Sequence, residues 1–233
     1  MQKEVSFGGI FRALASLLSG SSREVALFTL VVGGLTAAGI VSGMSEPTSG
    51  AVDFGFMVDD TSSPASALFD LVSAVVGVVA NYLLIKRFVA VTGQNDSGNR
   101  FWPYVGMAIL SAIGIVLGMI LLIVPGIILL VRWSAASGYL IGEGQGVTES
   151  LSSSWNATKG HSWPIFFAGL VLFLGVAIAA GMIGGILGVI STTAVNAVSA
   201  FLEAVSSAIF SAFGIAIYSL VRDDSRQLNE VFA

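Results

Sequence analysis

Five long apolar segments constrain the fold of this chain more than any other feature. They occupy residues 25–41, 67–84, 105–131, 165–190 and 198–220. A helix crosses the ~30 Å hydrocarbon core of a bilayer with about 20 apolar residues, so each segment is long enough, or nearly so, to span a membrane. Only 10% of the 233 residues are charged, whereas about a quarter are charged in soluble domains. The sequence therefore predicts an all-α polytopic membrane protein.

The third segment is too long for a single span. As one helix, residues 105–131 would extend roughly 40 Å at ~1.5 Å per residue. Pro125 lacks a backbone donor and Gly126 permits left-handed dihedral angles, and both properties suit a tight turn between helices. We therefore predict a hairpin turn at Pro125 and Gly126, which gives six spans in total.

Charge supports the six-span interpretation. With six spans, one side of the membrane receives Lys3, Arg12, Arg23, Lys86, Arg87, Arg100, Lys159, Arg222 and Arg226. The loops on the other side carry Glu46, Asp53, Asp59 and Asp60. Because Lys and Arg are enriched in cytoplasmic loops, we predict that both termini are cytoplasmic and that the turn lies on the far side. The mixed charges before the first span do not match a cleavable signal peptide, so this span is expected to stay uncleaved.

The predicted architecture is a bundle of six transmembrane helices with two interfacial amphipathic helices on the cytoplasmic side. From the apolar pattern, the spans are expected at about residues 24–42, 66–87, 102–124, 126–142, 164–190 and 196–220. The interfacial helices are expected at about residues 6–18 and 148–158. Trp102, Trp155 and Trp163 are expected at the membrane surface, where tryptophan is enriched.

Small residues recur every four positions in the last two apolar segments. The last segment contains Ala200, Ala204, Ala208, Ala212 and Ala216, and the preceding one contains Ala177, Gly181 and Gly185. A ridge of small residues lets two helix backbones approach closely. We predict that these two ridges pack against each other.

A polar face accompanies the alanine ridge. It consists of Ser199, Glu203, Ser207 and Ser211. A carboxylate inside a span is costly in lipid and is usually paired or in contact with water. Arg132 has a similar predicted depth, so we predict a buried ion pair between Arg132 and Glu203, with Asp70 as the alternative partner of Arg132. Such a pair fixes the register of the helices; alternatively, a solute or proton path runs along this serine face and Asn81, with Glu203 as its gate.

Few residues point to catalysis, metal binding or nucleic acid. A net charge of −4 without a cluster of Lys and Arg argues against a nucleic-acid partner. The chain has no cysteine and a single histidine, His161, so we expect no metal and no other cofactor. Residues 142–146 are rich in glycine but lack the lysine of a phosphate-binding loop. No acidic residue is spaced to orient His161, and we expect a non-enzymatic protein.

Residues 101–167 contain an ordered set of motifs. These are Ile123-Val124-Pro125-Gly126, Leu130-Val131-Arg132-Trp133-Ser134, a glycine-rich break at Glu143-Gly144, and Ser150, Leu151, Ser154, Trp155, Thr158, Lys159, Gly160 and Trp163. Their order and spacing resemble the YciC-like family and the related glycerophosphodiester phosphodiesterase membrane-domain-like proteins. The resemblance implies a six-span protein of the bacterial inner membrane and no particular chemistry. Ser152 and Ser153 differ from the basic residues that relatives tend to carry there.

Two functions agree with these predictions. The leading hypothesis is a structural or lipid-associated role in envelope maintenance, in which the amphipathic helices contact the inner leaflet. Membrane lipids are then the partners, and a homo-oligomer or a membrane-protein partner is left open. The alternative is a small-solute channel or transporter with a polar path along the sixth span.

Overall fold

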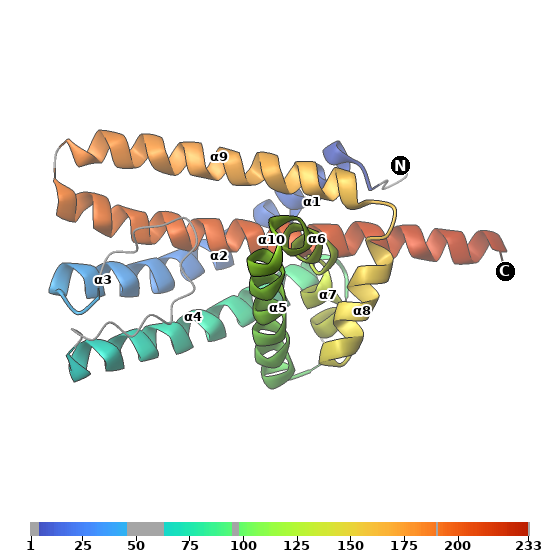
Figure 1. The fold of residues 1–233 in the computed structure, drawn as a ribbon, viewed down its shortest axis with the longest axis horizontal. Helices are drawn as coiled ribbons and strands as arrows, with labels where there is room; N and C mark the ends of the chain where they lie inside the picture. Colours follow the sequence, from blue (N-terminus) through green and yellow to red (C-terminus); the bar gives the residue numbers. More distant parts are fainter. Residues whose placement is uncertain (1–4, 46–62, 95–97, 190, 233) are drawn as a thin grey trace. The chain divides into compact units, whose positions relative to one another are not determined.

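A computed structural model describes residues 5–45, 63–94, 98–189 and 191–232, with side chains up to Arg222. Within these residues all regular structure is helical (Figure 1). The helices are α1 (Phe7–Gly20), α2 (Ser22–Phe28), α3 (Gly34–Ser42), α4 (Pro64–Val91), α5 (Phe101–Leu121), α6 (Ile123–Arg132), α7 (Ala136–Gly142), α8 (Val147–Ala157), α9 (Ser162–Gly188) and α10 (Thr192–Phe232). A π-helical turn, Thr29–Gly33, joins α2 to α3. The expectation of an all-α chain is confirmed for the described residues.

Six helical segments are long and apolar enough to cross a membrane. They are Ser22–Ser42, Pro64–Val91, Phe101–Leu121, Ile123–Gly142, Ser162–Gly188 and Thr192–Arg222. The prediction of six such segments is confirmed. The acidic loop residues Glu46, Asp53, Asp59 and Asp60 lie outside the described residues.

The chain divides into two compact units. The first unit comprises residues 1–22, 82–171 and 209–233, and the second comprises residues 23–81 and 172–208. Helices α4, α9 and α10 therefore contribute residues to both units.

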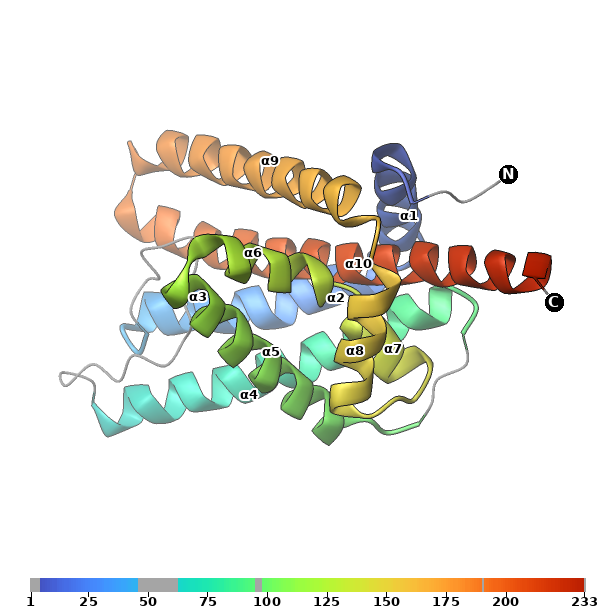
Figure 2. The ribbon, with the colours of Figure 1, turned by 45° about the vertical axis from the view of Figure 1, so that its right-hand side comes forward.

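In the first unit, α5 and α6 form a hairpin whose turn differs from the predicted one (Figure 2). The chain reverses at Leu122, which has an extended backbone and donates its N–H to the carbonyl of Gly118 over 3.1 Å. Pro125 lies inside the first turn of α6, where a missing N–H breaks no helical hydrogen bond. Gly126 is also helical, and a Cβ at Gly118 would lie 3.0 Å from its Cα. The turn prediction at Pro125 and Gly126 was therefore wrong, and Gly126 instead allows α5 and α6 to approach closely.

The amphipathic helix α1 also belongs to the first unit. Its N-cap is Ser6, whose hydroxyl accepts a hydrogen bond from the N–H of Gly9 at 3.2 Å. Ile10, Leu14 and Leu17 are buried on one face of the helix. The apolar side of α1 is therefore used mainly for packing within the protein.

In the second unit, the π-helical turn before α3 packs on α10 through its last residue, Gly33. A Cβ at Gly33 would lie 2.9 Å from the Phe201 ring. Ala200, Ala204 and Ala208 are buried, as the ridge prediction requires.

The predicted partner ridge on α9 does not take part in this packing. Ala177, Gly181 and Gly185 are exposed, and nothing lies within 4 Å of a Cβ placed at Gly181 or Gly185. The less exposed positions of α9 in this unit include Val176 and Ala180. The predicted packing of the two ridges was therefore wrong, because α9 turns a different face toward its unit.

Candidate functional site

Helix α8 is held against an interruption in the fourth apolar segment. Helix α6 ends at Arg132 and α7 begins at Ala136, so some backbone groups at this interruption need partners outside the two helices. The Ser154 hydroxyl of α8 donates to the Arg132 carbonyl at 2.7 Å and accepts from the Ala135 N–H at 3.2 Å. The Thr158 hydroxyl donates to the Ser154 carbonyl at 2.8 Å and lies 3.4 Å from the Arg132 carbonyl. We term Arg132–Ala135 together with Ser154, Trp155 and Thr158 the α8 docking site.

Hydroxyl groups define the buried face of α8. Ser150, Ser154 and Thr158 recur every four residues and are fully buried, and Leu151 is buried beside them. Each hydroxyl has a backbone partner, and that of Ser150 donates to the Val147 carbonyl at 2.8 Å. The prediction placed Leu151 on a lipid-facing surface, whereas this side chain packs inside the first unit.

The Arg132 side chain joins the same site from the opposite side. Its guanidinium lies 5.2 Å from the centre of the Trp155 ring, and Nη1 donates to the Trp155 carbonyl at 3.3 Å. A cation over an indole face is attracted by the negative potential of the ring. Arg132 and Trp155 therefore form a cation–π pair at one end of α8.

The ion pair between Arg132 and Glu203 stays a prediction, because the two residues belong to different units. Glu203 is exposed on the second unit, as is Ser207. The alternative partner, Asp70, accepts a hydrogen bond from the Ser45 hydroxyl at 2.5 Å within the second unit.

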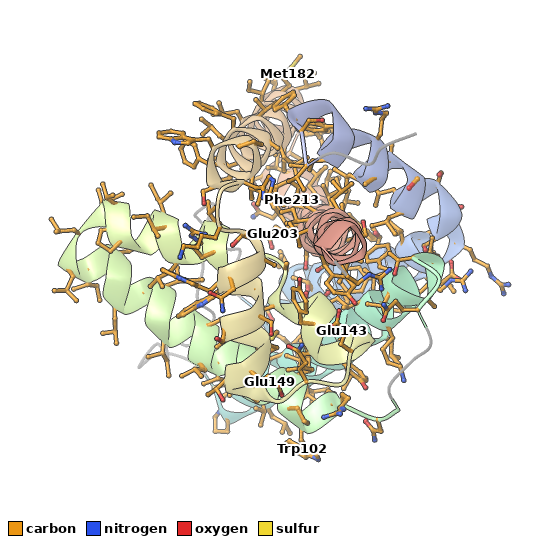
Figure 3. All side chains as sticks on the ribbon, turned by 90° about the vertical axis from the view of Figure 1, so that its right-hand side faces the viewer. Trp102, Glu143, Glu149, Met182, Glu203 and Phe213 are labelled. Atoms are coloured by element: carbon orange, nitrogen blue, oxygen red, sulfur yellow. The ribbon has the colours of Figure 1, made fainter. Side chains whose placement is uncertain are left out.

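A second polar cluster surrounds Tyr218 in the first unit. Tyr218 is fully buried, and its hydroxyl lies 3.3 Å from Glu143 Oε1. Arg222 Nη1 donates to this hydroxyl at 3.4 Å, and the guanidinium lies 5.4 Å from the Tyr218 ring centre. A Cβ at Gly138 would overlap the ring. The Glu143 carboxylate and the close contact at Gly138 tie α10 to the α7 region, while Arg222 acts from α10 itself; Figure 3 labels Glu143.

A cavity of about 150 Å³ lies in the first unit between α1, α4 and α10. Its lining consists of Ala13, Ser16, Leu17, Val91, Thr92, Ser219 and Arg222. A cavity of this size is large enough to hold several water molecules. Asn81, Ser207 and Ser211 do not line it, so the predicted polar path is not part of this cavity.

Two tryptophans stand at the starts of apolar helices in the first unit. Trp102 is 78% exposed in the first turn of α5, and Trp163 is 71% exposed in the first turn of α9. Figure 3 shows Trp102 at the periphery of the molecule. The start of α5 is fixed by Arg100, whose N–H donates to the Tyr82 hydroxyl at 2.8 Å and whose guanidinium donates to the Gly144 carbonyl. The exposed Trp102 indole is thus carried by a well-anchored helix start.

Several residues of these clusters were missed in the sequence. Ser154, Tyr218 and Glu143 were not predicted to contact other segments. For Ser154 a signal was present, because hydroxyl residues spaced by four are typical of helix faces that pack closely in membranes. Tyr218 and Glu143 lie 75 positions apart, and no periodic pattern connects them.

The first unit therefore combines close helix packing, the polar cluster around Tyr218 and two exposed tryptophans. Among the described residues, no three His, Asp or Glu side chains are grouped so that they could hold a metal ion. The chain was compared with protein-family models, with curated proteins and with solved structures, and it matches none of them.

Proposed function

We propose that this chain is a multi-pass protein of a bacterial inner membrane with a structural, lipid-associated role in the envelope, and that it catalyses no reaction. The observation that carries the proposal is the exposure of Trp102 and Trp163 in the first turns of two apolar helices. Indole rings favour the headgroup region because one part of the ring is apolar and the N–H is polar. Two such rings on one unit give it a fixed level relative to the lipid headgroups.

The amphipathic helix α1 supports contact with the same lipid region. The Phe7 and Phe11 rings lie 5.0 Å apart, and Phe7 is exposed while Ile10 and Leu14 face the protein. Arg12 is exposed on the same helix. An exposed phenylalanine, packed on a partly buried one and close to a cation, is suited to the boundary between acyl chains and anionic headgroups.

The proposal includes the sidedness and the family expected from the sequence. Both termini are placed in the cytoplasm by the distribution of Lys and Arg, and α1 and α8 then lie on the cytoplasmic side. The motifs of residues 101–167 support a relationship to YciC-like proteins.

A deletion strain tests this role. We expect its phospholipid profile or its envelope permeability to change, and we expect the intact gene to reverse the change. A double variant, Trp102→Ala with Trp163→Ala, should restore the strain poorly, whereas Leu174→Ala, which removes an equally apolar exposed side chain from α9, should restore it fully. Accumulation or loss of a soluble metabolite with an unchanged lipid profile would contradict the proposal and support the transporter alternative.

A further inference from the structure

The tip of the α5–α6 hairpin is apolar and uncovered. Ile120, Leu121, Leu122, Ile123 and Val124 are 65–76% exposed. Residues 112–131 contain no polar or charged side chain, and Leu122 lies in the middle of this run. A turn that reaches water on the far side of a membrane would expose five large apolar side chains there, so the tip of this hairpin is suited to hydrocarbon.

Helix α8 fixes the level of the other end of α6. The exposed face of α8 and of the residues that follow it carries Thr148, Glu149, Ser152, Asn156 and Lys159. Charged groups are costly in hydrocarbon, so this face belongs in water or among headgroups. Arg132 contacts Trp155 on α8, and it therefore lies near the headgroup level as well.

The length of α6 then limits how deep the tip can go. Helix α6 has 10 residues, which correspond to about 15 Å, or half of the ~30 Å hydrocarbon core. If Arg132 lies at the headgroup level, the other end of α6, at Ile123, reaches the middle of the bilayer only when the helix runs straight inward. The middle of the bilayer is therefore the greatest depth that the tip can have.

The direction of the hairpin agrees with this limit. Figure 3 looks nearly along the C-terminal part of α10, and α5 and α6 extend sideways from it. Transmembrane helices tilt by only ~20° on average from the membrane normal. If α10 follows this norm, the hairpin runs closer to the membrane plane than to the normal.

Part of the tip backbone is satisfied within the protein. Polar backbone groups in lipid need partners within the protein. The Leu122 N–H is bonded to the Gly118 carbonyl, and Pro125 removes one of the donors that a first helical turn leaves free. The close approach of Gly118 and Gly126 brings the two backbones into contact just behind the tip.

We infer that the α5–α6 hairpin is re-entrant: it inserts into the cytoplasmic leaflet, contacts acyl chains with its apolar tip, and returns without crossing the membrane. This inference rests on the membrane placement and sidedness of the proposed function. A re-entrant hairpin and a hairpin that crosses twice both return the chain to the cytoplasmic side. The basic residues therefore lie on the same side in either case, and their distribution does not favour the crossing hairpin. The tip is thus an interaction surface for the lipid acyl chains of one leaflet.

Single-cysteine labelling tests the inference, because the natural chain contains no cysteine. The variants are Leu122→Cys at the tip, Ala65→Cys at the exposed start of α4, and Ser152→Cys on the exposed face of α8. A membrane-impermeant maleimide should label Ala65→Cys in intact cells and Ser152→Cys only after the inner membrane is opened. Leu122→Cys should stay unlabelled in both preparations and become labelled after detergent unfolding.

A depth measurement in liposomes provides the second test. A nitroxide attached at residue 122 should show oxygen and nickel accessibilities between those of a nitroxide at residue 174, near the middle of α9, and those of a nitroxide at residue 152 on the exposed face of α8. Labelling of Leu122→Cys in intact cells, or nickel accessibility equal to that at residue 65, would overturn the re-entrant hairpin and leave the lipid-associated role intact. Labelling of Ala65→Cys only in opened membranes would instead overturn the proposed sidedness and the leaflet assigned to the hairpin.

Discussion

Replacing Ser154 with alanine should weaken the fold by removing two hydrogen bonds from the α8 docking site. The Arg132 carbonyl keeps a contact with the Thr158 hydroxyl at 3.4 Å, whereas the buried N–H of Ala135 loses the acceptor described at 3.2 Å. An orphaned buried donor costs about 1–3 kcal/mol and a lost neutral hydrogen bond about 1 kcal/mol. We therefore expect a loss of about 2–4 kcal/mol, equivalent to a roughly 30- to 800-fold change in the unfolding equilibrium.

The measurement is reversible unfolding by SDS in mixed micelles, followed by tryptophan fluorescence and circular dichroism. Ser152→Ala is the matched control, because Ser152 is exposed on the same helix, and it should shift stability by no more than about 0.5 kcal/mol. Ser154→Cys keeps a weak donor of similar size, so its stability should lie between those of Ser154→Ala and Ser152→Ala. If Ser154→Ala and Ser152→Ala unfold at the same SDS fraction, Ser154 does not satisfy the interrupted backbone and the reasoning is refuted.

Two further predictions concern the helix contacts. Gly33→Ala should destabilise the protein by about 1–3 kcal/mol, because the new Cβ would meet Phe201. The control is Gly34→Ala, where nothing lies within 4 Å of the new Cβ; it should leave stability unchanged or raise it by up to about 1 kcal/mol. Equal effects of the two variants in the SDS assay would contradict the close contact at Gly33. The effects of Arg132→Ala and Glu203→Gln should add within about 0.5 kcal/mol, because Trp155 already engages Arg132. A coupling above about 1 kcal/mol in this double-mutant cycle would instead support the predicted ion pair.

The six apolar segments were predictable because their cause is local. A segment dissolved in lipid must be apolar along its whole length, and this requirement is visible in the sequence without knowledge of its neighbours. The position of the α5–α6 turn was not predictable in the same way. Pro125 fits a turn and equally fits the first turn of a helix, and only the contact between Gly118 and Gly126 distinguishes the two.

Helix faces were harder to assign than helices. In lipid, apolar and small residues are suited to both the outside and the inside of a bundle, so hydrophobicity does not orient a helix. Ala177 and Gly181 therefore have the composition of a contact face although they are exposed. On α8 the hydroxyl of Ser154 is buried and Trp155 remains partly exposed, which reverses the expectation from a soluble amphipathic helix.

A hairpin confined to one leaflet has a mechanical consequence. Helix α6, about 15 Å long and ~10 Å across, covers roughly 150 Å² when it lies flat, and α5 adds to this area. The inserted area widens the cytoplasmic leaflet but not the opposite one, so the bilayer around each copy should acquire a spontaneous curvature. The protein would then concentrate in membrane regions whose cytoplasmic face is convex. In a mixture of vesicles, the amount of protein bound per unit of membrane area would depend on vesicle size alone.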